Sequence, residues 1–419
     1  MKHFRACMLP FAFAAVGVVR LLAKFGILVR FGTFWPPRIG HIGMNTECYL
    51  CEKDAGLHPK RTIDIWSLKA GLPFVPSPYL MKMWRRSMLV DPTRFSSIVM
   101  LCNLMFEGYE KHNAEPKQSD RDIHNLLETM PPHLKFTRRE EAKAKKIMRS
   151  WGIPEGAKWV CVIVRDNAYL PHLSYHDYRD ADIDNYLQAI YALANRGYYV
   201  FRMGKTVKND LQIRHSRIFD YARNGMQSDF MSIYLGAKCE FTMSTSTGWD
   251  AIPQIFRKPI CYTNFVPIEY LPTWQHSLAI WKHHEKDGKR MSVPEICDIG
   301  AGLFMRADQF KEAGITLIEN TPEEIREAAM EMADMVEGLS TPEPQEAFWR
   351  MFPRNVSPYN GHPLHGEKIR LRIGRQFLKD YYAERQEDIG GNPGARRIEA
   401  GAVQEHHDVQ RKAAYPVGY

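Results

Sequence analysis

Small hydroxyl residues and a glycine follow one of the apolar segments of this chain. They form the run Ser244-Thr-Ser-Thr-Gly248, between a predicted strand over Cys239–Met243 and a predicted helix. Free N–H groups at a helix start bind phosphate, and the helix dipole favours an anion there. An ordinary helix cap is the alternative interpretation. The diphosphate interpretation assigns substrate binding to Ser244, Thr245, Ser246, Thr247 and Gly248.

A second polar group comes directly after the apolar segment Lys158–Val164, which is predicted to be a buried strand. Arg165 would face the ligand crevice at the carboxyl end of that strand, where a guanidinium can grip a phosphate through two donors. We therefore predict that Arg165 is catalytic and that Asp166 and Tyr169 contact the substrate. A surface ion pair between Arg165 and Asp166 is the alternative.

A third group ends the next predicted strand, Tyr198–Arg202. Gly204 permits a close approach of the backbone to a ligand, although a strand-ending glycine is an equally reasonable interpretation. We predict substrate contacts from Arg202, Gly204 and Lys205.

Arg38-Ile-Gly40-His41-Ile-Gly43 forms a fourth group, between a predicted strand at Gly26–Phe31 and a helix that begins near Met44. Glycines on both sides of His41 predict a tight turn that presents the imidazole, which can accept a hydroxyl proton near neutral pH. Glu47 is the competing base. We also assign Arg38 and Gly40 to substrate binding.

Several motifs are absent from the sequence. It has neither the GxxxxGK[ST] of P-loop enzymes nor the GxGxxG of dinucleotide oxidoreductases. It has no Asp-x-Asp metal motif, since Asp180, Asp182 and Asp184 accompany a predicted helix start. Cys48 and Cys51 have metal-ligand spacing without a second pair. We expect no metal and no cofactor.

The second half of the chain alternates predicted strands and helices. Helices are expected over Ile183–Leu193 and Phe230–Ala237, and capping boxes open two more at Thr137 and Thr321. Further strands are expected at Pro259–Thr263 and Ile315–Ile318. This rhythm favours an α/β fold of two Rossmann-like, doubly wound domains that face a cleft.

The predicted organisation has five parts. An N-terminal segment over 1–24 precedes an acceptor-side domain over 25–150 and a donor-binding domain over 151–340. C-terminal helices over 341–385, including one from Glu367 to about Tyr382, precede a disordered tail over 386–419.

Residues 1–30 contain five basic residues and no acid, around an apolar run that Pro10 interrupts. The run is too short to span a bilayer comfortably, so we expect either an anchor on an anionic membrane surface or a buried strand and helix.

Composition narrows the class of protein. The 419 residues are 45% hydrophobic and 25% charged, with a net charge of +8, as expected for a globular chain. Eight scattered cysteines favour a reducing, cytoplasmic location, and the mild charge offers little support for nucleic-acid binding.

The order of these motifs, with Ser228-Asp229-Phe-Met-Ser-Ile-Tyr-Leu-Gly-Ala-Lys-Cys239 before the hydroxyl run, resembles a group of bacterial glycosyltransferases linked to surface polysaccharides. It is more distantly similar to GDP-fucose-type fucosyltransferases, although Val164-Arg165-Asp166 replaces their usual His-x-Arg. The resemblance covers about 35–385. It implies a GT-B fold, an Arg165 that grips the donor diphosphate, an Asp229 that shapes the nucleotide site, and phosphate contacts from Ser246 and Thr247.

The leading interpretation is a glycosyltransferase of the hexosyltransferase type, inverting and metal-independent. It would take a nucleoside-diphosphate sugar as donor and a glycan or lipid-linked hydroxyl as acceptor, with His41 as base. One alternative is a sugar-nucleotide 2-epimerase, which needs no acceptor. Another is a non-catalytic protein that binds a membrane surface through its basic amino terminus.

Overall fold

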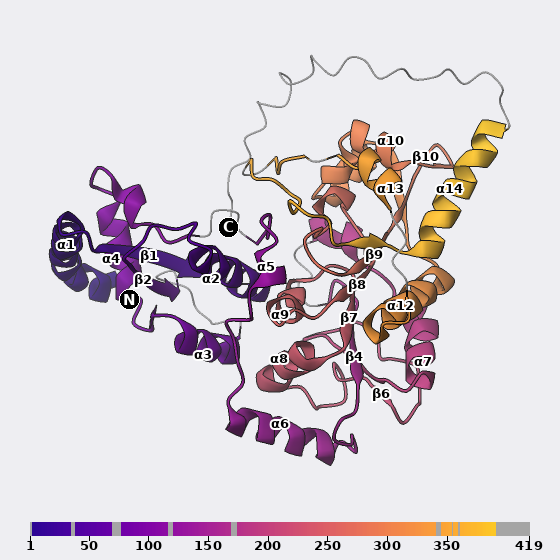
Figure 1. The fold of residues 1–419 in the computed structure, drawn as a ribbon, viewed down its shortest axis with the longest axis horizontal. Coiled ribbons are helices and arrows are strands. Elements are labelled where there is room, and N and C mark those ends of the chain that lie inside the picture. The colour runs from indigo at the N-terminus through magenta and orange to yellow at the C-terminus, as the bar shows by residue number, and fades with distance from the viewer. Residues whose placement is uncertain are drawn as a thin grey trace. The chain divides into compact units, whose positions relative to one another are not determined.

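The computed structural model describes residues 2–34, 38–68, 77–115, 120–168, 174–340, 345–353, 355–358 and 361–390. The chain forms two compact units, Met1–Phe377 and Leu378–Tyr419. Every named strand belongs to the first unit (Figure 1).

A parallel seven-stranded sheet organises the larger part of the first unit. Its strand order is β13-β9-β8-β7-β4-β5-β6. Both β4 and β8 are buried along their whole length, because helices cover both faces of the sheet. The strands are β4 (Trp159–Ile163), β5 (Tyr199–Arg202), β6 (Ile218–Phe219), β7 (Phe241–Ser244), β8 (Ile260–Phe265), β9 (Leu278–Trp281) and β13 (Arg372–Ile373).

The strand order reverses between β4 and β7. From β4 the chain adds β5 and β6 on one side, then returns to place β7 on the other side of β4. In open parallel sheets, ligands bind outside the carboxyl ends of the strands at such a switch point. The topology therefore directs attention to the residues that follow β4 and β7.

Helices pack on both faces of this sheet. Figure 1 shows α7 (Leu187–Asn195) and α12 (Pro322–Glu337) on one side of the strands, and α8 (Asp229–Lys238) and α9 (Ala251–Ile255) on the other. The predicted capping boxes at Thr137 and Thr321 are both formed, and they open α6 (Arg138–Ser150) and α12. The remaining helices here are α10 (Val293–Asp298), α11 (Ala307–Glu312) and α13 (Glu346–Met351).

The first third of the chain contains a second parallel sheet, β1-β2-β3. Its strands are β1 (Leu28–Phe34), β2 (Thr62–Leu68) and β3 (Val90–Asp91). Its helices are α2 (Thr46–Asp54), α3 (Pro78–Ser87), α4 (Phe95–Asn103) and the short α5 (Leu126–Thr129). The α/β class with parallel sheets is confirmed, whereas the domain boundary near residue 150 stays a prediction.

Two predicted elements differ from the structure. The strand β12 (Ile315–Ile318) is present, but it pairs antiparallel with β10 (His283–Lys286) in a separate small sheet that also contains β11 (Lys289–Arg290). The helix expected from Glu367 begins only at Arg375, because residues 367–371 are irregular and Arg372–Ile373 form β13. This helix, α14 (Arg375–Gly390), also contradicts the predicted disorder over 386–390; residues 391–419 lie outside the described part of the chain.

The amino terminus is one helix, α1 (Lys2–Lys24), which continues through Pro10. Within the described ranges, the stretch Cys7–Lys24 of this helix is long and apolar enough to cross a membrane, judged by length and composition alone. Its contacts are with α4 and β1, through a small apolar core that includes Val16, Val19 and Val99.

A buried ion-pair network ties β1 to β2. Arg30 on β1 donates to both carboxylate oxygens of Asp64 on β2, at 2.7 and 3.0 Å, and Lys53 and Tyr49 donate to the same carboxylate. Burial alone would raise the pKa of Asp64, but the hydrogen bonds from Arg30, Lys53 and Tyr49 outweigh it and hold that pKa well below its ordinary value. The network thus stabilises the folded state wherever the carboxyl is ionised.

We expect Asp64→Asn to lower the free energy of unfolding by about 3–5 kcal/mol, because it leaves the buried Arg30 without its counter-ion. Because the folded pKa lies below the unfolded one, the contribution is present above about pH 4 and is lost as the pH falls through the folded value. Urea unfolding measures both effects. Glu155→Gln, which removes an exposed pair with Lys145, is the control and should change little.

Candidate functional site

Polar residues gather at the switch point between β4 and β7. The backbone N–H of Arg165, just after β4, donates to Thr245 Oγ1, just after β7, at 2.8 Å. This bond joins two of the predicted groups directly. The arginine and the hydroxyl-rich turn are therefore neighbours at the carboxyl edge of the sheet.

Further cations lie around this junction. Arg165 Nε lies 3.0 Å from Asp180 Oδ1, and the Arg179 guanidinium donates to the carbonyl of Ser246. Lys282, buried at the end of β9, donates to the carbonyl of Asp180 at 2.5 Å. Burial lowers the pKa of Arg179 and of Lys282, because desolvation disfavours their charged forms.

His176 lies partly buried among the arginines of this cluster. Its pKa falls to about 4, first because the ring is partly buried and then because four guanidinium groups repel its charged form. Those groups belong to Arg179, Arg165, Arg38 and Arg306. Nδ1 of His176 is enclosed and has no hydrogen-bond partner among the described residues. The imidazole is therefore neutral at physiological pH, in a position where a bound anion would relieve the repulsion.

The balance of charge here favours a bound anion. Arg179 contacts an uncharged carbonyl, and Arg38 is exposed with no ion-pair partner in the described part of the chain. Arg306 pairs with Asp308, and Arg165 with Asp180. Several guanidinium groups near a strand end are an environment that binds a diphosphate.

The turn after β7 differs from its predicted role. Its amides are already used, because Thr245 N donates to Ile163 O, Ser246 N to Ser244 Oγ, and Thr247 N to Asp250 Oδ2 at 2.9 Å. The hydroxyls of Ser244 and Thr247 also donate to the carboxylate of Asp250. The predicted cradle of free N–H groups is thus not formed by Thr245, Ser246 and Thr247.

The buried carboxyl of Asp250 holds this turn through hydrogen bonds from Ser244 and Thr247. Burial raises its pKa to about 6, against the opposing hydrogen bonds from Ser244 and Thr247. Ser246 adopts φ 62°, a left-handed conformation unusual for a residue with a side chain. The turn is therefore a strained, internally bonded support, and the nearby arginines are the stronger candidates for holding phosphate.

The segment that carries His41 is helical from Ile39 onward and is not the predicted tight turn, and its start meets the turn after β7 directly. A Cβ atom added to Gly40 would lie 3.1 Å from both Cα and O of Gly248. A side chain at position 40 would displace the backbone of Gly248, so the absence of one at Gly40 lets this helix start approach the second sheet closely. His41 opens the π-helical turn η1 (His41–Asn45), and its Nδ1 is enclosed without a hydrogen-bond partner among the described residues.

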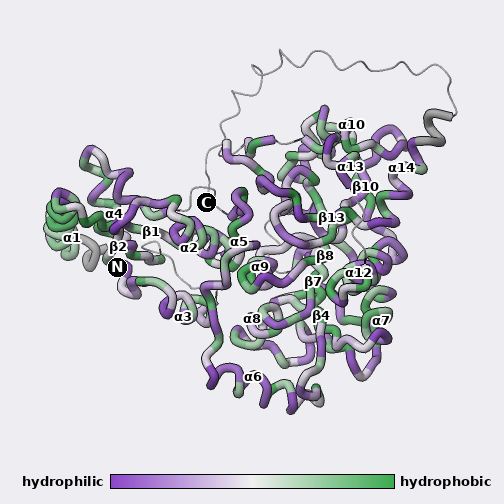
Figure 2. The backbone as a smooth tube through the Cα atoms, viewed as in Figure 1, coloured by the Kyte–Doolittle hydropathy of each residue, from purple (hydrophilic) through white to green (hydrophobic). Residues whose placement is uncertain are grey.

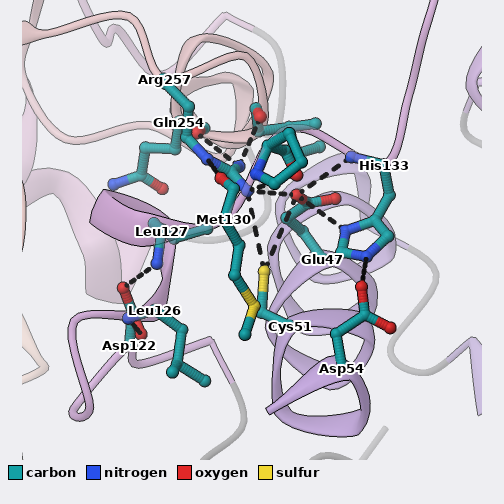
Figure 3. Close-up of polar contacts among 12 residues, drawn as sticks. Glu47, Cys51, Asp54, Asp122, Leu126, Leu127, Met130, His133, Gln254 and Arg257 are labelled. Carbon is teal, nitrogen blue, oxygen red and sulfur yellow. Dashed lines mark hydrogen bonds and ion pairs between the residues drawn. The ribbon is translucent and has the colours of Figure 1, made fainter.

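Figure 3 shows a cluster around Glu47, the predicted alternative base. Its side chain is fully buried, with Arg257 Nη2 at 2.7 Å and His133 Nδ1 at 3.1 Å. A carboxylate held by these two groups and sealed from solvent cannot reach an acceptor hydroxyl. The prediction of Glu47 as a base therefore does not fit its surroundings, and Glu47 links α2 to the residues after α9.

The same cluster has the spacing of a metal site. Ligand atoms of Glu47, Cys51 and His133 all lie within 4.8 Å of one another. Arg257 stands 2.7 Å from the carboxylate and 3.7 Å from the Cys51 sulfur, so a guanidinium already supplies the positive charge. Burial raises the pKa of Cys51, which keeps the thiol protonated. These features favour an ion-pair link over a metal centre.

Three predicted contacts are engaged elsewhere. Arg202 is buried against Asp220, with Nη1 to Oδ1 at 3.1 Å, so it does not face a ligand. Asp166 accepts from the N–H groups of Ala168 and Lys208. Asp229 accepts from the side chain of Ser77 at 2.7 Å and from the N–H of Tyr79 at 2.6 Å, at the start of α3.

The remaining predicted residues are Gly204, Lys205 and Tyr169. Gly204 has φ 151°, and a Cβ there would meet Val207 at 2.5 Å, so the glycine serves a tight turn. Lys205 is exposed in that turn. Tyr169 lies outside the described residues.

Sequence reasoning missed four residues of the cluster: the neutral His176 and the cations Arg179, Lys282 and Arg306. Three of them belong to short 3₁₀ segments or loops that have no apolar periodicity. Lys282 follows β9, a strand that was not predicted. Only the position of Lys282 after an apolar run, Leu278–Trp281, gave a signal comparable to that of Arg165.

No protein-family model and no curated protein matches this chain. Among solved structures, it is similar to the ADP-heptose lipopolysaccharide heptosyltransferase II of Escherichia coli, with 12% identity, a TM-score of 0.41, and coverage of 74% of this chain and 99% of the other. It is also similar to a family 9 glycosyl transferase from Veillonella parvula, with 11% identity, a TM-score of 0.39, and coverage of 60% and 85%. Such weak similarities carry no weight for function.

We expect Asp250 to contribute a fall in folding stability as the pH rises from about 4 to about 6, because it holds its proton more tightly when folded than when unfolded, whereas His176 and His284 contribute a rise over the same range. The effect of Asp250 is on the order of 3 kcal/mol, and Asp250→Asn should remove this contribution to the slope. Urea unfolding across this pH range tests the prediction. An unchanged slope in Asp250→Asn would contradict it, while the exposed Asp184→Asn should keep the wild-type slope.

Proposed function

We propose that this chain is a glycosyltransferase that moves a sugar from a nucleoside-diphosphate sugar to a hydroxyl of a glycan or lipid-linked acceptor, in surface-polysaccharide synthesis. One observation carries the proposal. The guanidinium groups of Arg165, Arg179, Arg38 and Arg306 gather around a neutral His176 at the switch point of a parallel sheet. This is where such a sheet binds nucleotides, and these are the groups that bind a diphosphate.

On the donor side, the bond between the anomeric carbon and the diphosphate oxygen breaks. The departing nucleoside diphosphate gains negative charge, and fixed cations aimed at it lower the barrier. Arg165 and Arg179 are the candidates for this role. Asp180 supports Arg165, and the Ser246 carbonyl supports Arg179, so neither guanidinium needs to reorganise during the reaction.

On the acceptor side, the hydroxyl oxygen forms a new bond to the anomeric carbon and gives up its proton. His41 is the proposed base, because the contact between Gly40 and Gly248 brings the start of its helical segment against the donor-side turn. Attack from the face opposite the leaving diphosphate inverts the anomeric centre. Arg38, exposed directly before this segment, would accompany the phosphates from this side.

The proposed mechanism is metal-independent. Divalent cations in phosphoryl and glycosyl transfer neutralise the charge that develops on the leaving group. Here the guanidinium groups around His176 supply positive charge at the same place.

We expect Arg165→Ala to lower transfer by about a hundredfold or more and to weaken binding of the nucleoside diphosphate, because a preorganised donor to the leaving group is lost. Calorimetric titration with UDP, GDP, ADP and CDP identifies the nucleotide, and product analysis measures transfer. Arg149→Ala on α6, an exposed arginine away from the sheet edge, is the matched control. Near-normal turnover in Arg165→Ala would remove this residue from the site.

Two further outcomes separate the alternatives. A product that contains only the epimerised donor, with no sugar added to an acceptor, would identify a 2-epimerase. Binding of none of the nucleotides would contradict the donor site altogether.

We expect chelation by EDTA to leave the initial rate of transfer unchanged, because cationic side chains take the place of a divalent ion at the leaving group. The rate is compared before and after dialysis against chelator, and after re-addition of Mg²⁺ or Mn²⁺. A rate that collapses with EDTA and recovers with either ion would refute the metal-independent mechanism.

A further inference from the structure

The first helix has two apolar faces. One face holds Ala12, Val16 and Val19, which are buried against Ile98 and Val99 of α4. This packing makes α1 part of the fold. A helix that is apolar only on this face would need nothing more.

The opposite face is also apolar, and it is exposed. We call this the outer face of α1: Phe11, Val18, Leu21 and, directly after the helix, Phe25, exposed by 69, 57, 53 and 75%. Spacings of seven, three and four residues place them along one side of a helix. Most of α1 is green in Figure 2, which shows how continuous its hydrophobic character is. A helix that is apolar all round is normally enclosed on all sides.

The outer face continues onto the residues after α4. Leu104, Met105 and Phe106 are exposed, and the Phe106 ring lies 6.4 Å from the ring of Phe13 on α1. Arg20 bridges the two segments, because its guanidinium donates to the side chain of Asn103 and lies 5.3 Å from the centre of the Phe106 ring. The apolar surface is therefore broad and is held rigidly on the domain.

The charge on and beside α1 is positive, although Glu107 and Glu110 are exposed just after Phe106. The helix α1 contains Lys2, Arg5, Arg20 and Lys24 and no acidic residue. Lys24 is exposed next to Phe25, and Lys60 and Arg61 are exposed at the start of β2, where the Arg61 carbonyl accepts from the N–H of Leu28. A second copy of the same face would bring like charges together. An anionic lipid surface complements both the apolar and the cationic groups.

We propose that the outer face of α1, together with Leu104–Phe106, is a docking surface for an anionic lipid bilayer, on which α1 lies in the plane of the membrane. A helix of 23 residues is about 35 Å long, enough to cross a bilayer. Crossing would, however, strip Ala12, Val16 and Val19 from α4 and expose the apolar core beneath them. Lying flat keeps that core and covers the exposed stripe.

Flotation of the full chain tests this proposal independently of sugar transfer. We expect the protein to float with vesicles of phosphatidylcholine and phosphatidylglycerol, and much less with phosphatidylcholine alone. Serine at all four outer-face positions (F11S, V18S, L21S and F25S) should reduce the bound fraction at least about tenfold. Ile299→Ser with Leu339→Ser, two exposed apolar residues elsewhere, is the matched control and should float like the wild type.

The outcomes that overturn the proposal are distinct. Wild-type protein that stays unbound with both vesicle types would refute the docking surface. A dimer detected by light scattering, which the four substitutions dissociate, would assign the outer face of α1 to contact with a second copy. Resistance of the wild type to alkaline carbonate extraction would show a spanning helix. Thermal unfolding monitored by circular dichroism verifies that the fourfold variant is folded. Loss of nucleotide binding with retained flotation would contradict the proposed function alone.

Discussion

Crowding of like charge at the carboxyl ends of β4 and β7 is the constraint on which the candidate site depends. Guanidinium groups that share a partly desolvated space repel one another unless counter-charges join them. The described carboxylates nearby are engaged in specific tasks: Asp180 faces Arg165, and Asp250 ties up the turn after β7. The four guanidinium groups around His176 still repel positive charge at that point, and an incoming diphosphate would lower the repulsion. Burial and then these guanidinium groups together lower the pKa of His176.

Contacts between distant parts of the sequence fix the position of His41 relative to the charged groups. Gly40 packs on Gly248, Glu47 pairs with Arg257, and Asp229 caps the start of α3. Each of these joins the first parallel sheet and its helices to the second. Glu47 and Asp229 have acidic side chains suited to catalysis or binding. Their carboxylates instead bind Arg257 and the start of α3, respectively. A buried carboxylate that has lost its cation is strongly destabilising, so the link between Glu47 and Arg257 resists separation.

The sequence predicted the framework better than the chemistry. Continuous apolar runs located β4, β5, β7 and β8, and the capping boxes located α6 and α12, because these signals are local. The switch point could not be predicted, since it depends on which strands pair. The role of Thr247 was misjudged for a related reason: the partner of its N–H, Asp250, is three residues away and is recognised only once the turn is built. Arg179 and His176 lie on an irregular segment, η3 (Ser174–Arg179), whose position is fixed by tertiary contacts alone.

The docking surface and the candidate site are connected by β1. The strand begins four residues after α1 ends, and its last residue, Phe34, precedes His41 by seven residues in the chain. Its seven residues span at most about 23 Å, so the proposed base lies within a few nanometres of the lipid if α1 lies on it. A single lipid-linked sugar would lie at the headgroups. It would be out of reach of His41 unless β1 runs nearly parallel to the membrane. A strand that rises steeply would instead favour an acceptor glycan of several sugars, long enough to bring its terminal hydroxyl up to His41.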